Sequence, residues 1–470
     1  MTLWSVWWEA ILLLRPAFSR RLTFMWFVSL AAGLTIRTEL LGVTSVVRAL
    51  KLNPKYYQSL LNVCHSTGVK LKKLTIQWLK LALKIMQPLV VNGRLVLLGD
   101  GLKIPKAGKQ MPGVKRLHQE SESNTKPEYI MGHSLQAVSL VCHALATFFA
   151  VPLTARIHEG VVLGPEDAGT LLDKMLRLVG SLELEQAFYF VADAYYASGK
   201  IIKGLLAQGN HLISRLRSNA VAYQLPTPTT GKRGRGRPRK YGERITLSSL
   251  AEDRNSMQVA ISPIYGEDRG KKKITIRYRV CDLVWKPAGV LVRFVAVCHP
   301  VRGIILLLCT DLTLDAIQII RLYGLRFKIE YGFKQAVRTL GAFAYHFWMR
   351  NLEPLQRRSG DQHVIGPMDE NREDVIRKVH AYHVFIQAGI ICQGLLQYLS
   401  VTYTAQVWGC FRSWLRTKRP GIPPSEFVVA EAMRTTFPEF LLVGAKRVFL
   451  AKFLVKRQDQ SRMGHLGMAA

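Results

Sequence analysis

The sequence has few acidic residues for its length. Its 470 residues include 32 aspartates and glutamates against 65 lysines and arginines, which gives a formal net charge of +33. A surface that binds only small acids does not need so large an excess, whereas a polyanion is strongly attracted by it. The shortage of acids therefore favours nucleic acid as the partner, with anionic lipid as the competing polyanion.

Long hydrophobic runs are also missing. The uncharged stretch 22–36 has only 15 residues, whereas about 20 apolar residues are needed to span a bilayer. The apolar region 437–454 is interrupted by Lys446, Arg447 and Lys452. The first residues lack the basic start and the small-residue cleavage site of a signal peptide. We therefore expect a buried helix over 22–36, no membrane partner and an intracellular protein.

The chain has no paired cysteine motif. Its 7 cysteines are scattered and odd in number, and no two of them form a C-x-x-C pair. This pattern excludes the usual zinc ribbons and disulfide frameworks and is typical of a reducing cytosol.

The hydrophobic patterns predict an α/β (mixed α+β) fold. Short apolar runs indicate buried strands, and apolar residues at steps of three and four indicate helices. After residue 90 their order predicts a mixed sheet flanked by helices. We expect a helical N-terminal region at 1–90, the first part of the core at 91–218, a basic linker with a β-rich insertion at 219–312, the second part of the core at 313–400, and a basic helical C-terminal region at 401–470.

Residues 42–66 in the N-terminal region read as two short helices hinged at Asn53-Pro54. This arrangement is compatible with a small helical unit that binds DNA. A helical packing domain without a role in nucleic-acid binding explains the pattern equally well.

Three carboxylates are distinguished by their placement. Asp100 and Asp193 each end an apolar strand, and Glu330 lies on the polar side of a helix predicted over 321–343. If the strands are neighbours and the helix crosses their ends, the three acids converge. Carboxylate oxygens are ligands for Mg²⁺ or Mn²⁺, and two such ions about 3.5–4 Å apart catalyse in-line phosphoryl displacement.

Each of these acids also has a simpler interpretation. An aspartate after a strand often caps a loop, and Glu330 can pair with Arg326 and Lys334 one turn away. Other acids compete for the third position, and one of them, Asp311, also follows an apolar strand. The competing acids are Asp173, Asp282, Asp311 and Asp315.

The segment RLYGLRFKIEYGFKQAVRTLGAF (321–343), with LLGDG and YFVADAYYASGK upstream, resembles bacterial insertion-sequence DDE transposases. Their signature around the third catalytic acid is Tyr-x2-Arg-x3-Glu-x6-Lys, and Tyr323, Arg326 and Glu330 match its first three positions. The resemblance covers roughly residues 90–400. It implies an RNase H-like core that is interrupted by a β-rich insertion.

The chain departs from this signature at its fourth position, where Val337 replaces the lysine. The resemblance implies that Lys334 or Arg338 takes over the lysine's role. It further implies that Tyr323 and Arg326 contact DNA phosphates.

The resemblance also implies a reaction. Asp100, Asp193 and Glu330 would hold two Mg²⁺ or Mn²⁺ ions. The protein would cut double-stranded DNA at transposon terminal repeats and join the freed 3′ hydroxyl to target DNA without a nucleotide cofactor. Because two ends are cut together, we expect a homodimer in the DNA complex. The expected location is the bacterial cytoplasm, on the nucleoid when DNA is bound.

Two further residues are candidates for the neighbourhood of this site. His133, in the sequence MGHS, lies between Asp100 and the second strand. In some such transposases an aromatic residue on the insertion stacks on a flipped base, and Trp285 is the tryptophan within this insertion. The alternatives are a hydrogen-bonded core histidine and a core tryptophan.

The sequence GRGRPRK (234–240) contains the Arg-Gly-Arg-Pro core of an AT-hook, an extended peptide whose arginines enter A·T-rich minor grooves. The alternative is a solvated basic linker that binds phosphates without preference. The DNA-contacting residues in either case are Arg235, Arg237, Arg239 and Lys240.

Two other functions fit the same sequence. A metal-dependent DNA nuclease without strand transfer would share the three acids. A catalytically inactive DNA-binding relative would need the charge and not the acids. The presence of all three acids argues against an inactive relative, whereas the loss of the signature lysine at Val337 favours one.

Overall fold

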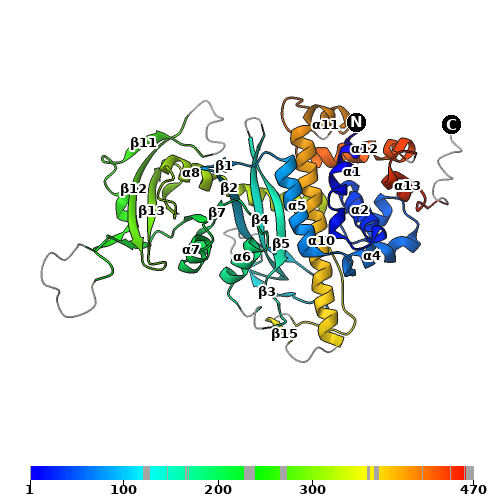
Figure 1. The fold of residues 1–470 in the computed structure, drawn as a ribbon, viewed down its shortest axis with the longest axis horizontal. Helices are drawn as coiled ribbons and strands as arrows, with labels where there is room; N and C mark the ends of the chain where they lie inside the picture. The colour runs from blue at the N-terminus through cyan, green and yellow to red at the C-terminus, as the bar shows by residue number, and fades with distance from the viewer. Residues whose placement is uncertain are drawn as a thin grey trace.

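The fold combines one large mixed sheet with a body of helices packed against it. In Figure 1 the β-rich half lies on the left, and the blue N-terminal helices meet the orange and red C-terminal helices on the right. The computed structural model describes residues 2–119, 127–144, 147–164, 167, 169–226, 239–264, 273–356, 360–364, 370–414, 416–444, 446–459 and 461.

The central part of the sheet has the strand order β5-β4-β2-β7-β8. β2 is parallel to β7, and β7 to β8, whereas β4 is antiparallel to both β2 and β5. The strands are β2 (Arg94–Pro105), β4 (Tyr129–Ala144), β5 (Thr147–Ile157), β7 (Phe188–Ala192) and β8 (His211–Arg215). This order is that of an RNase H-like core, so the predicted fold class is confirmed.

The strands of the predicted insertion continue this sheet. β14 pairs antiparallel with β8, and the whole sheet has 13 strands. The added strands are β9 (Val221–Tyr223), β10 (Arg244–Thr246), β11 (Gln258–Ile261), β12 (Thr275–Trp285), β13 (Val290–His299) and β14 (Gly303–Cys309). At the other end of the sheet, β3 (Lys115–His118) pairs with β4, and β1 (Val90–Val91) pairs with the start of β2. β6 (Val161–Val162) and β15 (Gln362–His363) form a separate pair.

Helices cover both faces of the central strands. α6 (Leu171–Gly180) and α7 (Gly199–Leu206) contribute to the same hydrophobic cluster as Leu95 and Leu97 of β2. The opposite face, with Val96 and Leu98, is covered by α8 (Ala316–Gly324) and α9 (Phe327–Gln335). Because successive strand residues point to opposite faces, each face of β2 is assigned to one pair of helices.

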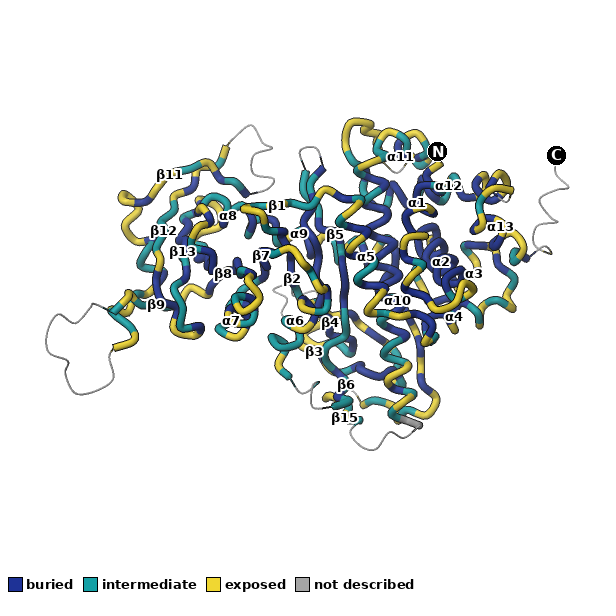
Figure 2. Tube along the Cα trace, in the orientation of Figure 1, coloured by how far each residue is buried: buried dark blue, intermediate teal, exposed yellow. Residues whose placement is uncertain are grey.

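The helical body is built around α10 (Glu370–Thr402), which lies between β5 and α2 in Figure 1. α10 is long and apolar enough to cross a membrane, but 89% of its apolar window is buried inside the protein, as the dark tube in Figure 2 shows. Its apolarity is therefore explained by its position in the core. The other helices of the body are α1 (Leu3–Leu12), α2 (Arg21–Ile36), α3 (Thr44–Ala49), α4 (Tyr57–His65), α5 (Leu71–Ile85), α11 (Thr404–Cys410), α12 (Glu426–Gly444) and α13 (Phe449–Val455).

The buried helix predicted over 22–36 is confirmed as α2, in which every residue from Phe24 to Ile36 is buried. α1 and α2 both pack against α10 and α12. These two N-terminal helices therefore belong to the packing of the helical body.

A close contact between α10 and α5 provides a test of this packing. A Cβ at Gly394 would lie 2.2 Å from Cζ2 of Trp78, whose ring is fully buried. We expect Gly394→Ala to destabilise the fold by about 1–3 kcal/mol through overpacking, measured as a loss in urea unfolding free energy. Gly409→Ala in α11, where a Cβ meets nothing within 4 Å, should be neutral or stabilising. Equal stability of the two variants would contradict the packing described.

Candidate active site

Asp100 and Asp193 lie at the same edge and on the same face of the sheet. Gly99 is the register partner of Ala192 in the parallel pair β2–β7, so the next residue on each strand is one of the two aspartates. Val96 and Leu98 share the α8–α9 face with Tyr189 and Val191. By the two-residue period of a strand, Asp100 and Asp193 continue the two rows on that face.

Glycine at position 99 makes this pairing possible. A Cβ there would lie 2.1 Å from the ring of Phe190 on the neighbouring strand. Phe190 is 1% exposed, so its ring has no room to move. The Gly-Asp-Gly sequence thus combines close packing on one face with a carboxylate on the other.

The predicted helix over 321–343 is divided into three pieces, so the prediction of one continuous helix was wrong. At Leu325 and Arg326 the hydrogen bonds join residues three apart, to Leu322 and Tyr323. α9 then runs to Gln335, and a π-helical segment, η6 (Ala336–Leu340), ends at Gly341 with φ 58°. The tight junction keeps Leu322, Leu325 and Ile329 buried against the sheet.

Arg326 connects the carboxylates at the start of α9. Its Nη1 donates to Oδ2 of Asp100 at 3.0 Å, and its Nη2 donates to Oε1 of Glu330. Asp100 also accepts a hydrogen bond from the Gly101 backbone N–H at 2.8 Å. Asp193 caps a 3₁₀ turn by accepting from the Tyr195 N–H at 3.1 Å. The predicted ion pair of Glu330 with Arg326 is therefore present, and it joins Glu330 to Asp100 through one guanidinium.

The position of Asp100 disfavours the ionised form of its carboxyl group. Burial raises its pKa to about 6, and the neighbouring Asp193 and Glu330 act in the same direction, although Arg326 opposes them. The side chain of Asp100 is 16% exposed, against 53% for Glu330. Burial likewise raises the pKa of Tyr323, which lies close to Arg326, Arg215 and Asp193.

The carboxylate oxygens of the three acids are of the chemical type that binds a divalent cation. Carboxylate oxygens are hard ligands of the type that Mg²⁺ and Mn²⁺ prefer, and the raised pKa of Asp100 shows that one arginine does not fully compensate the buried charge. In the described residues, however, no three His, Cys, Asp or Glu side chains are grouped closely enough to hold a metal ion as they stand. Arg326 currently interacts with the oxygens that such an ion would use.

The competing acids all have other structural partners. Asp311 follows β14, which runs antiparallel to β8, so it lies at the edge where β8 begins and away from Asp100 and Asp193. There it accepts hydrogen bonds from Tyr189 Oη at 2.6 Å and from Thr313. Asp173 belongs to the capping box of α6, Asp282 pairs with Arg293, and Asp315 caps α8.

His133 and Trp285 are not at this site. His133 is fully buried, and its ring nitrogens contact Tyr345 Oη at 2.7 Å and the Pro112 carbonyl at 3.0 Å. Burial lowers its pKa to about 3, which agrees with a neutral core histidine. Trp285 is 6% exposed and packs in the main hydrophobic cluster. Both residues therefore follow the core alternative, because neither ring is free to meet DNA.

Apart from Arg326, the basic residues predicted to contact DNA are exposed where the structure describes them. Lys334 and Arg338 are both exposed, on α9 and on the π-helical segment respectively, and Val337 between them is 41% exposed. Arg239 and Lys240 are exposed beside β10. Arg235 and Arg237 lie outside the described residues.

The sequence did not identify two polar residues beneath the acids. Tyr196 is 3% exposed, and Asp100 and Asp193 both help to raise the pKa of its hydroxyl, although burial is the largest cause. Its Oη is 3.5 Å from Nε2 of Gln136, the register partner of Gly101 on β4. The sequence signal was weak, because Gln136 is one of several polar residues in β4.

Comparison with known proteins agrees with this geometry. No curated protein matches the chain. The family model described as DDE superfamily endonuclease matches residues 14–279, more than half of the 470 residues. The match includes Asp100 and Asp193 and ends before Glu330. Nucleases of this superfamily act on DNA and generally depend on divalent metal ions. The chain belongs to the DDE superfamily of endonucleases.

Proposed function

We propose that the protein is a DNA transposase that cleaves transposon ends and joins the 3′ hydroxyl to target DNA. The observation that carries this proposal is the convergence of Asp100 and Asp193, each directly after the last paired residue of the parallel strands β2 and β7, with Glu330 on the helix packed over them. Tyr323, Arg326 and Glu330, which match the first three positions of the transposase signature, all belong to this site.

The three acids have distinct positions for this chemistry. Asp100 and Asp193 are fixed by the sheet, whereas Glu330 is half-exposed on a helix. Together they would hold two Mg²⁺ or Mn²⁺ ions, which supply activation of the attacking oxygen and stabilisation of the leaving one. Arg326 holds Asp100 and Glu330 together and compensates part of their charge. In the DNA complex its guanidinium would face a phosphate.

DNA is bound by the basic surface around these acids in this proposal. Tyr323 and Arg326 contact phosphates of the transposon end. Position 337 is a valine where the signature has a lysine, and Lys334 or Arg338 takes over the role of that lysine. The N-terminal region 1–90 contributes to end binding, and two copies of the chain bring two terminal repeats together.

A metal-dependent nuclease without strand transfer is the second candidate. It needs the same three acids and the same ions, so only the products separate the two functions. An inactive DNA-binding relative would keep DNA affinity without any cleavage.

The first prediction concerns the acids. Asp100→Asn, Asp193→Asn and Glu330→Gln should each abolish cleavage and joining of transposon-end DNA in Mg²⁺ by at least about 1,000-fold, because each removes a charged ligand. DNA affinity measured in EDTA should persist. The measurement is gel analysis of cleaved and joined products.

Asp311→Asn is the matched control, since Asp311 also follows an apolar strand but lies at the opposite edge. It should cut at close to the wild-type rate. If Glu330→Gln cut normally and Asp311→Asn did not, the third acid would be misassigned. Cleavage without joining by the wild-type protein would favour the nuclease.

The second prediction uses the raised pKa of Asp100. Burial raises the pKa of Asp100 to about 6 in the folded protein, whereas the unfolded chain has the ordinary aspartate pKa of about 3.9. The stability contributed by the proton on Asp100 is thus present at low pH and is lost as pH rises through 6. Asp100→Asn should therefore raise the Tm of the metal-free protein at about pH 7.5 and much less at about pH 4.5.

Mg²⁺ provides the second part of this test. At about pH 7.5 it should raise the Tm of the wild-type protein and leave that of Asp100→Asn unchanged, because an ion that binds only the folded state stabilises it. Asp253→Asn is the control, since hydrogen bonding with Ser256 lowers the pKa of Asp253. Asp253→Asn should not raise the Tm of the metal-free protein at about pH 7.5. A Tm rise with Mg²⁺ in Asp100→Asn equal to that of the wild type would refute the metal assignment.

A further inference from the structure

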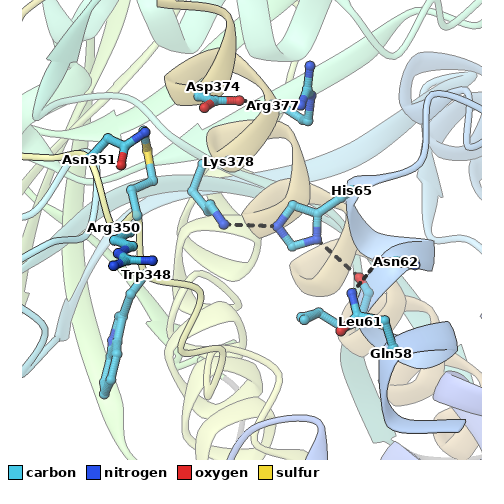
Figure 3. Close-up of a pocket in the computed structure, with 11 residues that line it drawn as sticks. Gln58, Leu61, Asn62, His65, Trp348, Arg350, Asn351, Asp374, Arg377 and Lys378 are labelled. Carbon is cyan, nitrogen blue, oxygen red and sulfur yellow. Dashed lines mark hydrogen bonds and ion pairs between the residues drawn. The ribbon is translucent and has the colours of Figure 1, made fainter. Parts of the chain in front are cut away.

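A pocket of about 430 Å³ lies between α4, the chain around residues 348–351 and the first turns of α10 (Figure 3). Its volume is within the range of small-ligand sites, roughly 300–1,000 Å³. None of Asp100, Asp193 and Glu330 is among the described residues that line it. The pocket is therefore a separate feature from the three acids.

One wall of the pocket is an exposed tryptophan. Trp348 is 63% exposed, although its neighbours Phe347 and Met349 are 4% and 5% exposed. His346 and Arg350 are exposed as well, so alternate residues of this segment face solvent. Phe347 and Met349 anchor the segment, and Trp348 contributes little to the core. A large exposed indole beside a pocket is typical of a binding surface.

The segment is held rigidly in this position. The Met349 N–H donates to the Gln110 carbonyl at 2.9 Å, and Nε2 of Gln110 donates to the Arg350 and Leu352 carbonyls at 3.2 and 3.0 Å. Tyr382 Oη donates to the Phe347 carbonyl at 2.6 Å. Trp348 is thus presented by a fixed backbone, which reduces the entropy lost when a ligand binds.

The opposite wall carries positive charge. Figure 3 shows Lys378 of α10 pointing across the pocket toward His65 of α4, and Lys378 Nζ lies 3.2 Å from His65 Nε2. His65 Nδ1 is 3.1 Å from the Leu61 carbonyl, so Nδ1 carries the hydrogen and Nε2 accepts from Lys378. This histidine is neutral, and the charge of Lys378 is not cancelled by it.

Bases outnumber acids in the pocket. Arg350, Arg377 and Lys378 line it, and the carboxylate among its described lining residues, Asp374, pairs with Arg377 at 3.3 Å. The amide side chains of Gln58, Asn62 and Asn351 complete the polar wall. The pocket therefore offers a cationic side, hydrogen-bonding amides and one flat aromatic face.

We infer that this pocket binds one unpaired nucleotide of a DNA strand. Its phosphate would lie against Lys378 and Arg350, and its base would stack on the indole of Trp348. Stacking on an aromatic side chain beside a basic groove is the common way to bind single-stranded nucleic acid. An acidic peptide would use the bases and leave the indole without a partner. The inference rests on the proposed function only in taking DNA as its ligand.

The test measures DNA binding in EDTA, because the chelator removes the divalent ions that cleavage would need and so separates binding from cleavage. The probe is a fluorescein-labelled duplex with a short single-stranded overhang that contains 2-aminopurine, compared with the blunt duplex. The wild-type protein should prefer the overhang and quench the 2-aminopurine. Trp348→Ala should weaken overhang binding about tenfold and abolish the quenching, whereas Trp348→Phe should retain most of both.

Arg350→Gln and Lys378→Gln should weaken binding and reduce the slope of affinity against salt by about one ion each. Trp414→Ala, at a 90% exposed tryptophan outside the pocket, and Lys80→Gln, at an exposed lysine of α5, are the controls and should change neither quenching nor overhang preference. Unchanged quenching in Trp348→Ala, or no overhang preference in the wild type, would overturn the inference. Loss of cleavage in Asp100→Asn with intact quenching would leave it standing.

Discussion

The parallel pairing of β2 with β7 is the constraint on which the rest of the site depends. Parallel neighbours end at one edge of a sheet, so residues after their last paired positions are brought together. Gly99 and Ala192 are those positions. The strand period then fixes the face on which both aspartates lie, and the hydrophobic rows below them, Val96–Leu98 and Tyr189–Val191, attract α8 and α9 to that face. Glu330 reaches the two aspartates because its helix is needed to cover these rows.

Placing carboxylates at such an edge has an electrostatic consequence. Two or three negative charges in a half-buried position repel one another and lose hydration, which disfavours ionisation. Arg326 reduces this cost, and its side chain is only 20% exposed, so its pairing with Asp100 is screened less than a surface ion pair. It does not remove the cost, since the pKa of Asp100 still lies near 6. In the proposed function, a divalent cation would supply the positive charge that Arg326 does not provide.

Local patterns in the sequence predicted the elements well and their long-range partners poorly. The strand that ends before Asp193, the mixed sheet, the buried helix over 22–36 and the membership of the DDE superfamily were predicted correctly. The strand predicted to end at Asp100 continues to Pro105, because β4 pairs with it beyond the aspartate. The continuation of the sheet into the 219–312 segment depends on β14 pairing with β8, between residues far apart in the chain, which no local pattern encodes. The break at Leu325 was missed because the apolar stripe continues through it. His133 and Trp285 were read as site candidates because a sequence does not show which side chains are enclosed.

Two of the basic side chains, Arg37 and Lys106, are buried inside the protein. Arg37, 2% exposed, donates to the carbonyls of Leu340 and Gly341, which end the helical segment that follows Glu330. Lys106, just beyond the end of β2, donates to the carbonyls of Phe343 and Tyr345. Cations at a helix C-terminus satisfy carbonyls that have no helical partner. Burial lowers the pKa of Lys106 to about 7 and that of Arg37 to about 10, so part of the favourable interaction is lost to desolvation. These two bases connect the chain after Glu330 to the end of α2 and to the strand of Asp100, and this connection adds to the packing of α9 on the sheet in positioning Glu330.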